Sequence, residues 1–125
     1  MGSVLEVTAS DWEKEVLESD VLTVVDFWQH HCPWCLSLDP ILDEVSEEYK
    51  GKIKFTKIDF LKTPENLNLA VQHGIMSTPT LVFFCTGRPI QQAVGLMPKQ
   101  NLEKLLDDVL EKHKDCFAQS TKIQV

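Results

Sequence analysis

Apolar residues recur along the chain in two alternating patterns, one typical of strands and the other of helices. Residues 21–28 are almost continuously apolar and β-branched, which indicates a strand buried on both faces of a sheet. From Leu38 to Tyr49 the apolar positions recur at helical spacing, with Pro40 inside the pattern. Residues 53–59 then alternate with period two. This part of the chain therefore predicts a strand, a helix and a second strand.

Further along the chain, the same patterns predict one more helix and a hairpin. Thr63 suits the N-cap of a helix that starts with proline, and Gly74 can end that helix. Residues 80–84 and 90–94 are strand-like and are separated by a turn at Gly87. The two strands should pair as an antiparallel hairpin.

The ends of the chain complete the expected fold. Residues 102–110 predict a last amphipathic helix starting near Pro98, while a short strand at residues 4–7 precedes a first helix with a capping box at residues 10–13. Helical crossovers make their strands parallel, so the prediction is an α/β fold: a three-layer α/β/α sandwich with a mixed five-stranded sheet and four helices. We expect residues 1–113 to form this domain and 114–125 a short, mobile C-terminal extension.

Composition narrows the choice of partners and location. A chain of 125 residues suffices for one domain, and its 12 basic and 19 acidic residues give a net charge of −7. That field repels phosphate backbones and anionic lipid, so neither nucleic acid nor a membrane is an expected partner. The amino terminus has neither the basic start nor the apolar run of a secretion signal. We therefore expect a cytoplasmic monomer.

The four cysteines are the most informative residues. They are too few for a disulfide-stapled scaffold and too unevenly spread for a four-cysteine zinc site. Cys85 ends a predicted strand and Cys116 follows the last helix, so both are expected to be packing or exposed thiols, with oxidative dimerisation through Cys116 as an alternative. Cys32 and Cys35 stand close together and carry the candidate chemistry.

The Cys32-Pro33-Trp34-Cys35 segment lies where the buried strand ends and the helix begins. Free backbone N–H groups and the helix dipole stabilise negative charge there, which makes Cys32 a candidate nucleophilic thiolate. Cys35 follows one helical turn later, close enough to attack a mixed disulfide formed on Cys32. The position of the pair predicts reversible dithiol chemistry.

A metal site is the alternative interpretation of this segment. Cys-x-x-Cys can be half of a zinc site, and His30 and His31 lie directly upstream. No second pair of cysteines or histidines follows at ligand spacing, and adjacent His31 and Cys32 make an awkward chelate. We therefore expect no metal and no other cofactor.

Other side chains near the pair are candidates for proton transfer and substrate binding. Asp26 lies in the apolar strand, where desolvation would raise its pKa and suit it to proton exchange; the alternative is an aspartate pointing to solvent. Lys57, on the neighbouring strand, could pair with Asp26 or be an exposed strand lysine. Trp28 and Trp34 flank the cysteines and could offer an apolar surface to a peptide.

Taken together, these residues resemble the thioredoxin family over about residues 4–110. The family's landmarks occur in order as Asp26-Phe27-Trp28, Cys32-x-x-Cys35, Pro40, Lys57-Ile58-Asp59, Gly74-Ile75, Thr78-Pro79-Thr80-Leu81, Gly87 and Val94-Gly95. The resemblance implies a thiol-disulfide oxidoreductase that reduces protein disulfides. The expected electron donor is a thioredoxin reductase or a low-molecular-weight thiol.

The resemblance assigns roles to individual residues. It implies that Cys32 is the exposed attacking thiol, Cys35 the buried resolving thiol and Asp26 the buried proton acceptor and donor. Pro79 should be a cis-proline. Substrate backbone should pair beside Thr78, with docking over Trp28, Ile75 and Gly95.

The active-site segment departs from the family pattern. Typical thioredoxins have Gly-Pro between the cysteines, whereas Pro33-Trp34 is similar to the Pro-Tyr of glutaredoxins, and Leu36 replaces a basic residue. We expect a reduction potential less reducing than that of a standard thioredoxin, with His31 supplying part of the missing charge. The alternatives are a glutaredoxin-like reductase using a low-molecular-weight thiol, a metal or iron–sulfur module, and a redox-inert adaptor.

Overall fold

The computed structural model describes residues 2–116, and within them five strands form one mixed sheet. The strands are β1 (Val4–Glu6), β2 (Leu22–Trp28), β3 (Ile53–Asp59), β4 (Thr80–Cys85) and β5 (Arg88–Val94), in the spatial order β1-β3-β2-β4-β5. β3 runs parallel to both β1 and β2, whereas β4 is antiparallel to β2 and to β5. The predicted mixed sheet, with β2 at its centre, is confirmed.

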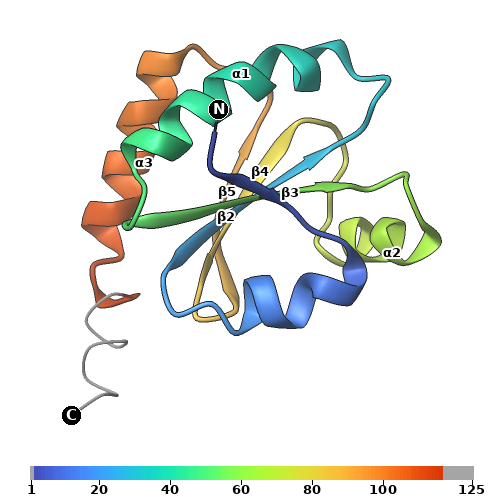
Figure 1. Ribbon diagram of the computed structural model, residues 1–125, viewed down its shortest axis with the longest axis horizontal. Coiled ribbons are helices and arrows are strands. Elements are labelled where there is room, and N and C mark those ends of the chain that lie inside the picture. Colours follow the sequence, from blue (N-terminus) through green and yellow to red (C-terminus); the bar gives the residue numbers. More distant parts are fainter. Residues whose placement is uncertain (1, 117–125) are drawn as a thin grey trace.

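Helices cover both faces of this sheet (Figure 1). α1 (Pro33–Glu48) and α3 (Lys99–Lys112) lie on one face, and α2 (Pro64–Gln72) lies on the other with the helical segment of residues 9–17. Each face has its own apolar core. The first contains Leu38 and Leu42 of α1 and Leu102 and Leu106 of α3, and the second contains Trp12, Val16 and Ala70. The predicted three-layer α/β/α sandwich is therefore present.

The first helical segment begins earlier than its sequence predicts. The Thr8 N–H donates to Asp11 Oδ2 at 3.0 Å, so Thr8 and not Ser10 caps a 3₁₀ turn over Ala9–Asp11. A π-helical turn, Glu13–Leu17, follows it. A capping box needs its acceptor three residues after the cap, and Asp11 has that spacing from Thr8. Trp12 between the two turns is buried against Phe27 and Phe84.

Local signals elsewhere agree with the structure. Thr63 Oγ1 accepts the Asn66 N–H at 3.0 Å and so caps α2, and Gly74 follows its end with a φ of +68°. Gly87 turns the β4–β5 hairpin with a φ of +82°, and a Cβ there would lie 2.8 Å from the Leu17 carbonyl oxygen. That turn therefore requires glycine for both its conformation and its space.

The structure corrects the expectation for the two isolated cysteines. Cys85 and Cys116 are disulfide-bonded, with their Cα atoms 5.7 Å apart, and both are buried in the core beneath α3. Neither is a free thiol, because the hairpin and α3 return the chain to the end of β4. The remaining residues of the predicted extension, 117–125, lie outside the described part of the chain. No helix within residues 2–116 is long and apolar enough to cross a membrane.

Candidate active site

The Cys32–Cys35 pair lies at the junction that the sequence predicts. β2 ends at Trp28, a short loop follows, and Cys32 is the N-cap of α1 with Pro33 as its first residue. Proline suits that position because its missing N–H has no intrahelical partner there. The first turn of α1 brings Cys35 back to Cys32, so that their Cα atoms are 5.2 Å apart and their sulfurs are disulfide-bonded.

The helix start provides hydrogen-bond donors for Cys32. The Cys35 N–H donates to Cys32 Sγ at 3.1 Å, and the Leu36 N–H donates to the Cys32 carbonyl oxygen at 3.1 Å. A thiolate on Cys32 would accept the same N–H group and lie at the positive end of the helix dipole. Cys32 is 6% exposed and Cys35 2%. Both residues are therefore buried, and Cys32 is not the exposed thiol that the family resemblance implies.

Asp26 is a buried carboxyl on the face of the sheet that α1 covers. It is 1% exposed, and its Oδ1 has no hydrogen-bond partner within the described residues. Burial, followed by the nearby carboxylate of Asp39, raises the pKa of Asp26 to about 7, while Lys57 opposes this shift. The Asp26 carboxyl can therefore gain and lose a proton near neutral pH, and it does not point to solvent.

Lys57 is the cross-strand neighbour of Asp26 but forms its ion pair elsewhere. Lys57 Nζ lies 3.1 Å from Asp39 Oδ1 on α1 and 5.2 Å from the centre of the Trp28 ring. Its side chain is 20% exposed. Lys57 is therefore neither bonded to Asp26 nor a freely exposed strand lysine, the two interpretations that its sequence position allows.

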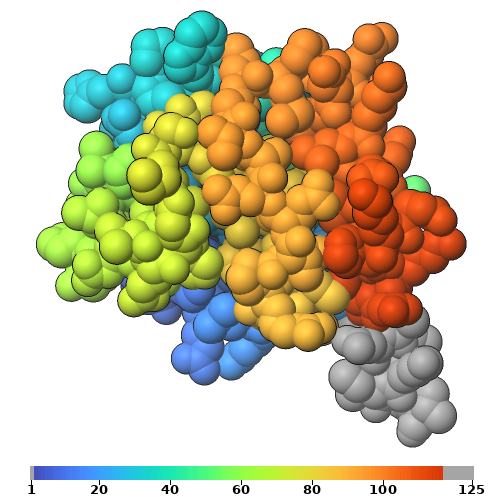
Figure 2. Space-filling model, turned by 180° about the vertical axis from the view of Figure 1, so that it is seen from behind, coloured from blue at the N-terminus to red at the C-terminus, as the bar shows by residue number. Residues whose placement is uncertain are grey.

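A groove runs beside the cysteine pair. Cys32 Sγ lies 3.5 Å from the Thr78 carbonyl oxygen, and the Thr78–Pro79 peptide bond is cis, as the resemblance implies. The Gly95 N–H donates to the Pro79 carbonyl oxygen at 2.8 Å, which ties the loop after β5 to the loop before β4. A pocket of about 300 Å³ lies between them, lined by Trp34, Thr78, Gly95 and Leu96. The corresponding cyan, yellow and orange segments adjoin on one face of the molecule (Figure 2).

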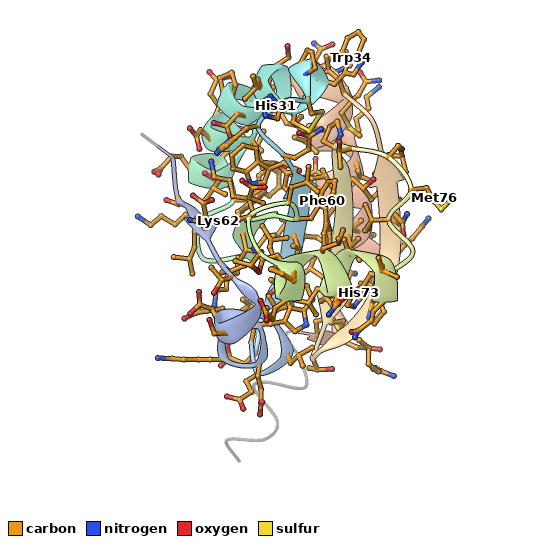
Figure 3. All side chains as sticks on the ribbon, turned by 90° about the vertical axis from the view of Figure 1, so that its right-hand side faces the viewer. His31, Trp34, Phe60, Lys62, His73 and Met76 are labelled. Carbon is orange, nitrogen blue, oxygen red and sulfur yellow. A yellow bond between two sulfur atoms is a disulfide. The ribbon has the colours of Figure 1, made fainter. Side chains whose placement is uncertain are left out.

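Exposed apolar side chains occur in the segments that line this groove and beside them in the sequence. Trp34 is 62% exposed and Met76 93%, and both project outward from the surface (Figure 3). Ile75 is half-buried against the second core, and Trp28 is half-buried, with the His30 ring 4.7 Å from its own. Leu96, which lines the pocket, and the exposed Met76 were not selected from the sequence, although each directly follows a residue that was, Gly95 and Ile75.

The histidines do not form a metal site with the cysteines. His30 Nε2 lies 3.5 Å from Asp59 Oδ2, at a separate cleft of about 390 Å³ that His31 and Lys62 also line. Among residues 2–116, no group of three His, Cys, Asp or Glu side chains is placed to hold a metal ion. The alternative of a metal or iron–sulfur module is therefore not favoured.

A reversible cysteine pair at the start of a helix, beside a groove open to other chains, is suited to exchange with external disulfides. Fold and site thus define a thiol-disulfide oxidoreductase. The sequence model of the Thioredoxin family matches residues 3–108, and the chain belongs to this family. Its activity is that of a protein-disulfide reductase.

Several curated relatives are similar over most of the chain. Thioredoxin 1 of Nostoc sp. is 42% identical over 113 residues, which cover 90% of this chain and 99% of the relative. A thioredoxin of Rickettsia felis is 44% identical over 77% of this chain and 89% of its own. Thioredoxin M4, chloroplastic, of Arabidopsis thaliana is 37% identical over 86% of this chain and 54% of its own.

Proposed function

We propose that Cys32 is the attacking thiol and Cys35 the resolving thiol of this reductase. The Cys32 thiolate attacks one sulfur of a substrate disulfide, forms a bond to it and releases the other substrate sulfur as a thiolate. Cys35 then attacks Cys32 Sγ, which closes the Cys32–Cys35 disulfide and releases the second substrate thiolate. Two electrons pass from the dithiol to the substrate. The observation that carries this assignment is the Cys35 N–H bonded to Cys32 Sγ at the start of α1.

Asp26 takes part in the second step as the proton acceptor. Cys35 must lose its thiol proton before it attacks, and its burial separates it from bulk water. Asp26 lies on the sheet face beneath the helix that carries Cys35, and its pKa of about 7 suits proton exchange. Its ionised carboxyl accepts the Cys35 proton and later passes it to water or to the released thiolate.

The substrates are disulfide-containing proteins that dock in the groove between Trp34 and Leu96. An extended segment beside the Thr78 carbonyl would place its disulfide next to Cys32 Sγ. The electron donor is a thioredoxin reductase, and the protein acts as a cytoplasmic monomer in cell redox homeostasis. Support for these assignments comes from the family and from the apolar side chains around the groove.

Insulin reduction and mixed-disulfide trapping test the two cysteine roles. Cys32→Ser should abolish insulin reduction, whereas Cys35→Ser should accumulate mixed disulfides through Cys32. The matched control is the double variant Cys32→Ser/Cys35→Ser, which should trap nothing while its Cys85–Cys116 disulfide stays intact. Insulin reduction that persists in Cys32→Ser would contradict the assignment.

The electron donor needs a separate measurement. The oxidised protein should be reduced by NADPH with a flavin-dependent thioredoxin reductase, and not by glutathione with glutathione reductase. The Pro33-Trp34 dipeptide makes this comparison informative, because a similar dipeptide occurs in glutaredoxins. Reduction by glutathione alone would replace the proposed donor with a low-molecular-weight thiol.

A further inference from the structure

Asp26 and Lys57 share one face of the sheet, and that face is covered by α1. They are directly paired in the parallel β2–β3 register, so their side chains point the same way. Val24 and Phe55, two residues earlier on each strand, pack in the core that contains the apolar residues of α1. Lys57 is therefore placed where it could turn its ammonium group towards Asp26.

The charged groups around Asp26 come from two elements. β3 contributes Lys57, and α1 contributes the carboxylate of Asp39; in the reduced protein α1 also carries the Cys35 thiol. The β4 neighbour in register is Leu81, which carries no charge. The state of Asp26 thus depends on how one cation and one anion are arranged. In the structure the cation is bonded to the anion, since Lys57 Nζ lies 3.1 Å from Asp39 Oδ1.

We propose that Asp39 is a positioning residue for the proton step: it holds the Lys57 ammonium at the outer edge of the site, over Trp28, and so leaves the Asp26 carboxyl free to exchange its proton with Cys35. This inference rests on the proposed role of Asp26 as proton acceptor. Asp39 itself does not contact the reacting sulfurs; it acts through Lys57 and through its own charge.

The physical basis is the cost of a buried charge. An ammonium group in contact with Asp26 would stabilise the ionised carboxylate, and the carboxyl would then hold no proton at neutral pH. When Lys57 is bonded to Asp39, the effects of these two charges on the Asp26 carboxyl largely cancel, and burial then determines the pKa of Asp26. Burial and Asp39 together raise the pKa of Asp26 to about 7, with Lys57 as the opposing influence.

The resolving step shows why the proton affinity of Asp26 matters. Cys35 gives its thiol proton to the Asp26 carboxylate, and its sulfur forms a bond to Cys32 Sγ. The bond between Cys32 Sγ and the substrate sulfur breaks, and its electron pair leaves on the substrate thiolate, which takes a proton from water. A carboxylate whose pKa is far below that of the thiol is a weaker base, so an Asp26 bonded to Lys57 would accept the proton less readily.

The direct test is the titration of Asp26 in the oxidised protein, where no active-site thiol titrates. In the wild type, the ¹³C shift of the Asp26 carboxyl, followed by NMR from pH 4 to 10, should give a titration midpoint near pH 7. In Asp39→Asn we expect this midpoint to fall by about one pH unit, since an anion is lost and Lys57 is released. The matched control is Glu44→Gln, which removes a carboxylate of α1 whose ion-pair partner is Lys99. Its midpoint should not move.

Making the same substitution in a variant that lacks Lys57 distinguishes a positioning role of Asp39 from a direct effect of its charge. In Lys57→Met, the added Asp39→Asn change should shift the Asp26 midpoint by less than half as much as it does when Lys57 is present. Equal shifts in both backgrounds would overturn the positioning role, and an unchanged midpoint in Asp39→Asn would overturn the inference altogether. Asp39→Glu, which keeps the charge, should restore most of the wild-type midpoint.

Kinetics distinguish a failure of this inference from a failure of the proposed function. The measurement is the single-turnover rate at which a dye-labelled peptide thiol is released from its mixed disulfide with Cys32. Asp26→Asn should remove the change in this rate near neutral pH. Asp39→Asn should lower the rate several-fold at pH 8. If Asp26→Asn leaves the profile unchanged, the proposed base is wrong, while the NMR midpoints still report on Asp39. If Asp26→Asn changes the profile and Asp39→Asn does not, the inference alone is wrong.

Discussion

Cys85, the last residue of β4, is disulfide-bonded to Cys116, which follows the end of α3. The bond joins residues 31 positions apart in the sequence, with β5 and α3 between them, so both elements are tied to the end of β4. β4 begins next to Pro79 at the active site and ends at Cys85. The Cys85–Cys116 disulfide therefore lies at the opposite end of β4 from Cys32.

This second disulfide should contribute to stability and not to catalysis. In a Cys32→Ser/Cys35→Ser background, adding Cys85→Ala/Cys116→Ala should lower the free energy of unfolding by about 3–4 kcal/mol, the loop-closure entropy of a segment of this length. Urea denaturation under oxidising conditions measures the difference. With excess reductant both proteins have lost the crosslink and should nearly coincide. A difference that survives reduction would assign the effect to packing.

Asp26 should make stability depend on pH. An aspartate in an unfolded chain titrates near about 3.9, whereas burial raises the pKa of Asp26 to about 7 in the folded protein. The folded state therefore binds more protons than the unfolded state between these values, and stability falls as pH rises through this window. Relative to Asp26→Asn, the wild type should lose on the order of 3–4 kcal/mol between pH 4 and pH 8.

Denaturation of oxidised wild type and Asp26→Asn at several pH values measures this difference. The variant should be the more stable protein above pH 7, because it removes an ionised carboxyl from an apolar site. Glu44→Gln serves as the control, since it removes an exposed carboxylate of α1. A constant difference between wild type and Asp26→Asn from pH 4 to pH 8 would show that the Asp26 pKa is not raised.

Trp34 should matter for protein substrates and not for small disulfides. Its exposed ring lines the groove beside Cys32, so a docked polypeptide would cover it. Trp34→Ala should reduce kcat/KM for insulin about tenfold, which corresponds to roughly 1.4 kcal/mol of lost binding. The rate with a small aromatic disulfide should change little. Val71→Ala, at an equally exposed apolar position on α2, should leave both rates unchanged.

The residues between the cysteines should set a distinctive reduction potential. We expect the Cys32/Cys35 couple to lie above about −270 mV, the thioredoxin value, in a titration against defined glutathione or dithiothreitol buffers. Replacing Pro33-Trp34 with the Gly-Pro of typical thioredoxins should lower the potential towards that value. A wild-type potential at or below −270 mV would reject this expectation.

Local sequence signals predicted much of the fold because they act over a few residues. The period-two pattern of residues 53–59 matches β3, Thr63 caps α2, and Gly87 turns the hairpin. The first helical segment was predicted less well, because Thr8 with Asp11 and Ser10 with Glu13 both have capping-box spacing, and the structure uses the first pair. Competing caps two residues apart are not distinguished by periodicity.

Neighbours along the chain define the candidate chemistry of this protein: a cysteine pair at a strand-to-helix junction and an aspartate within an apolar strand. The packing of the fold determines that Lys57 bonds to Asp39 and not to Asp26, and that Cys85 bonds to Cys116. Ion pairs and disulfides form between side chains that meet in space, here 18 and 31 residues apart. Whether two such side chains meet depends on how the helices pack on the sheet, and no local sequence pattern encodes that packing.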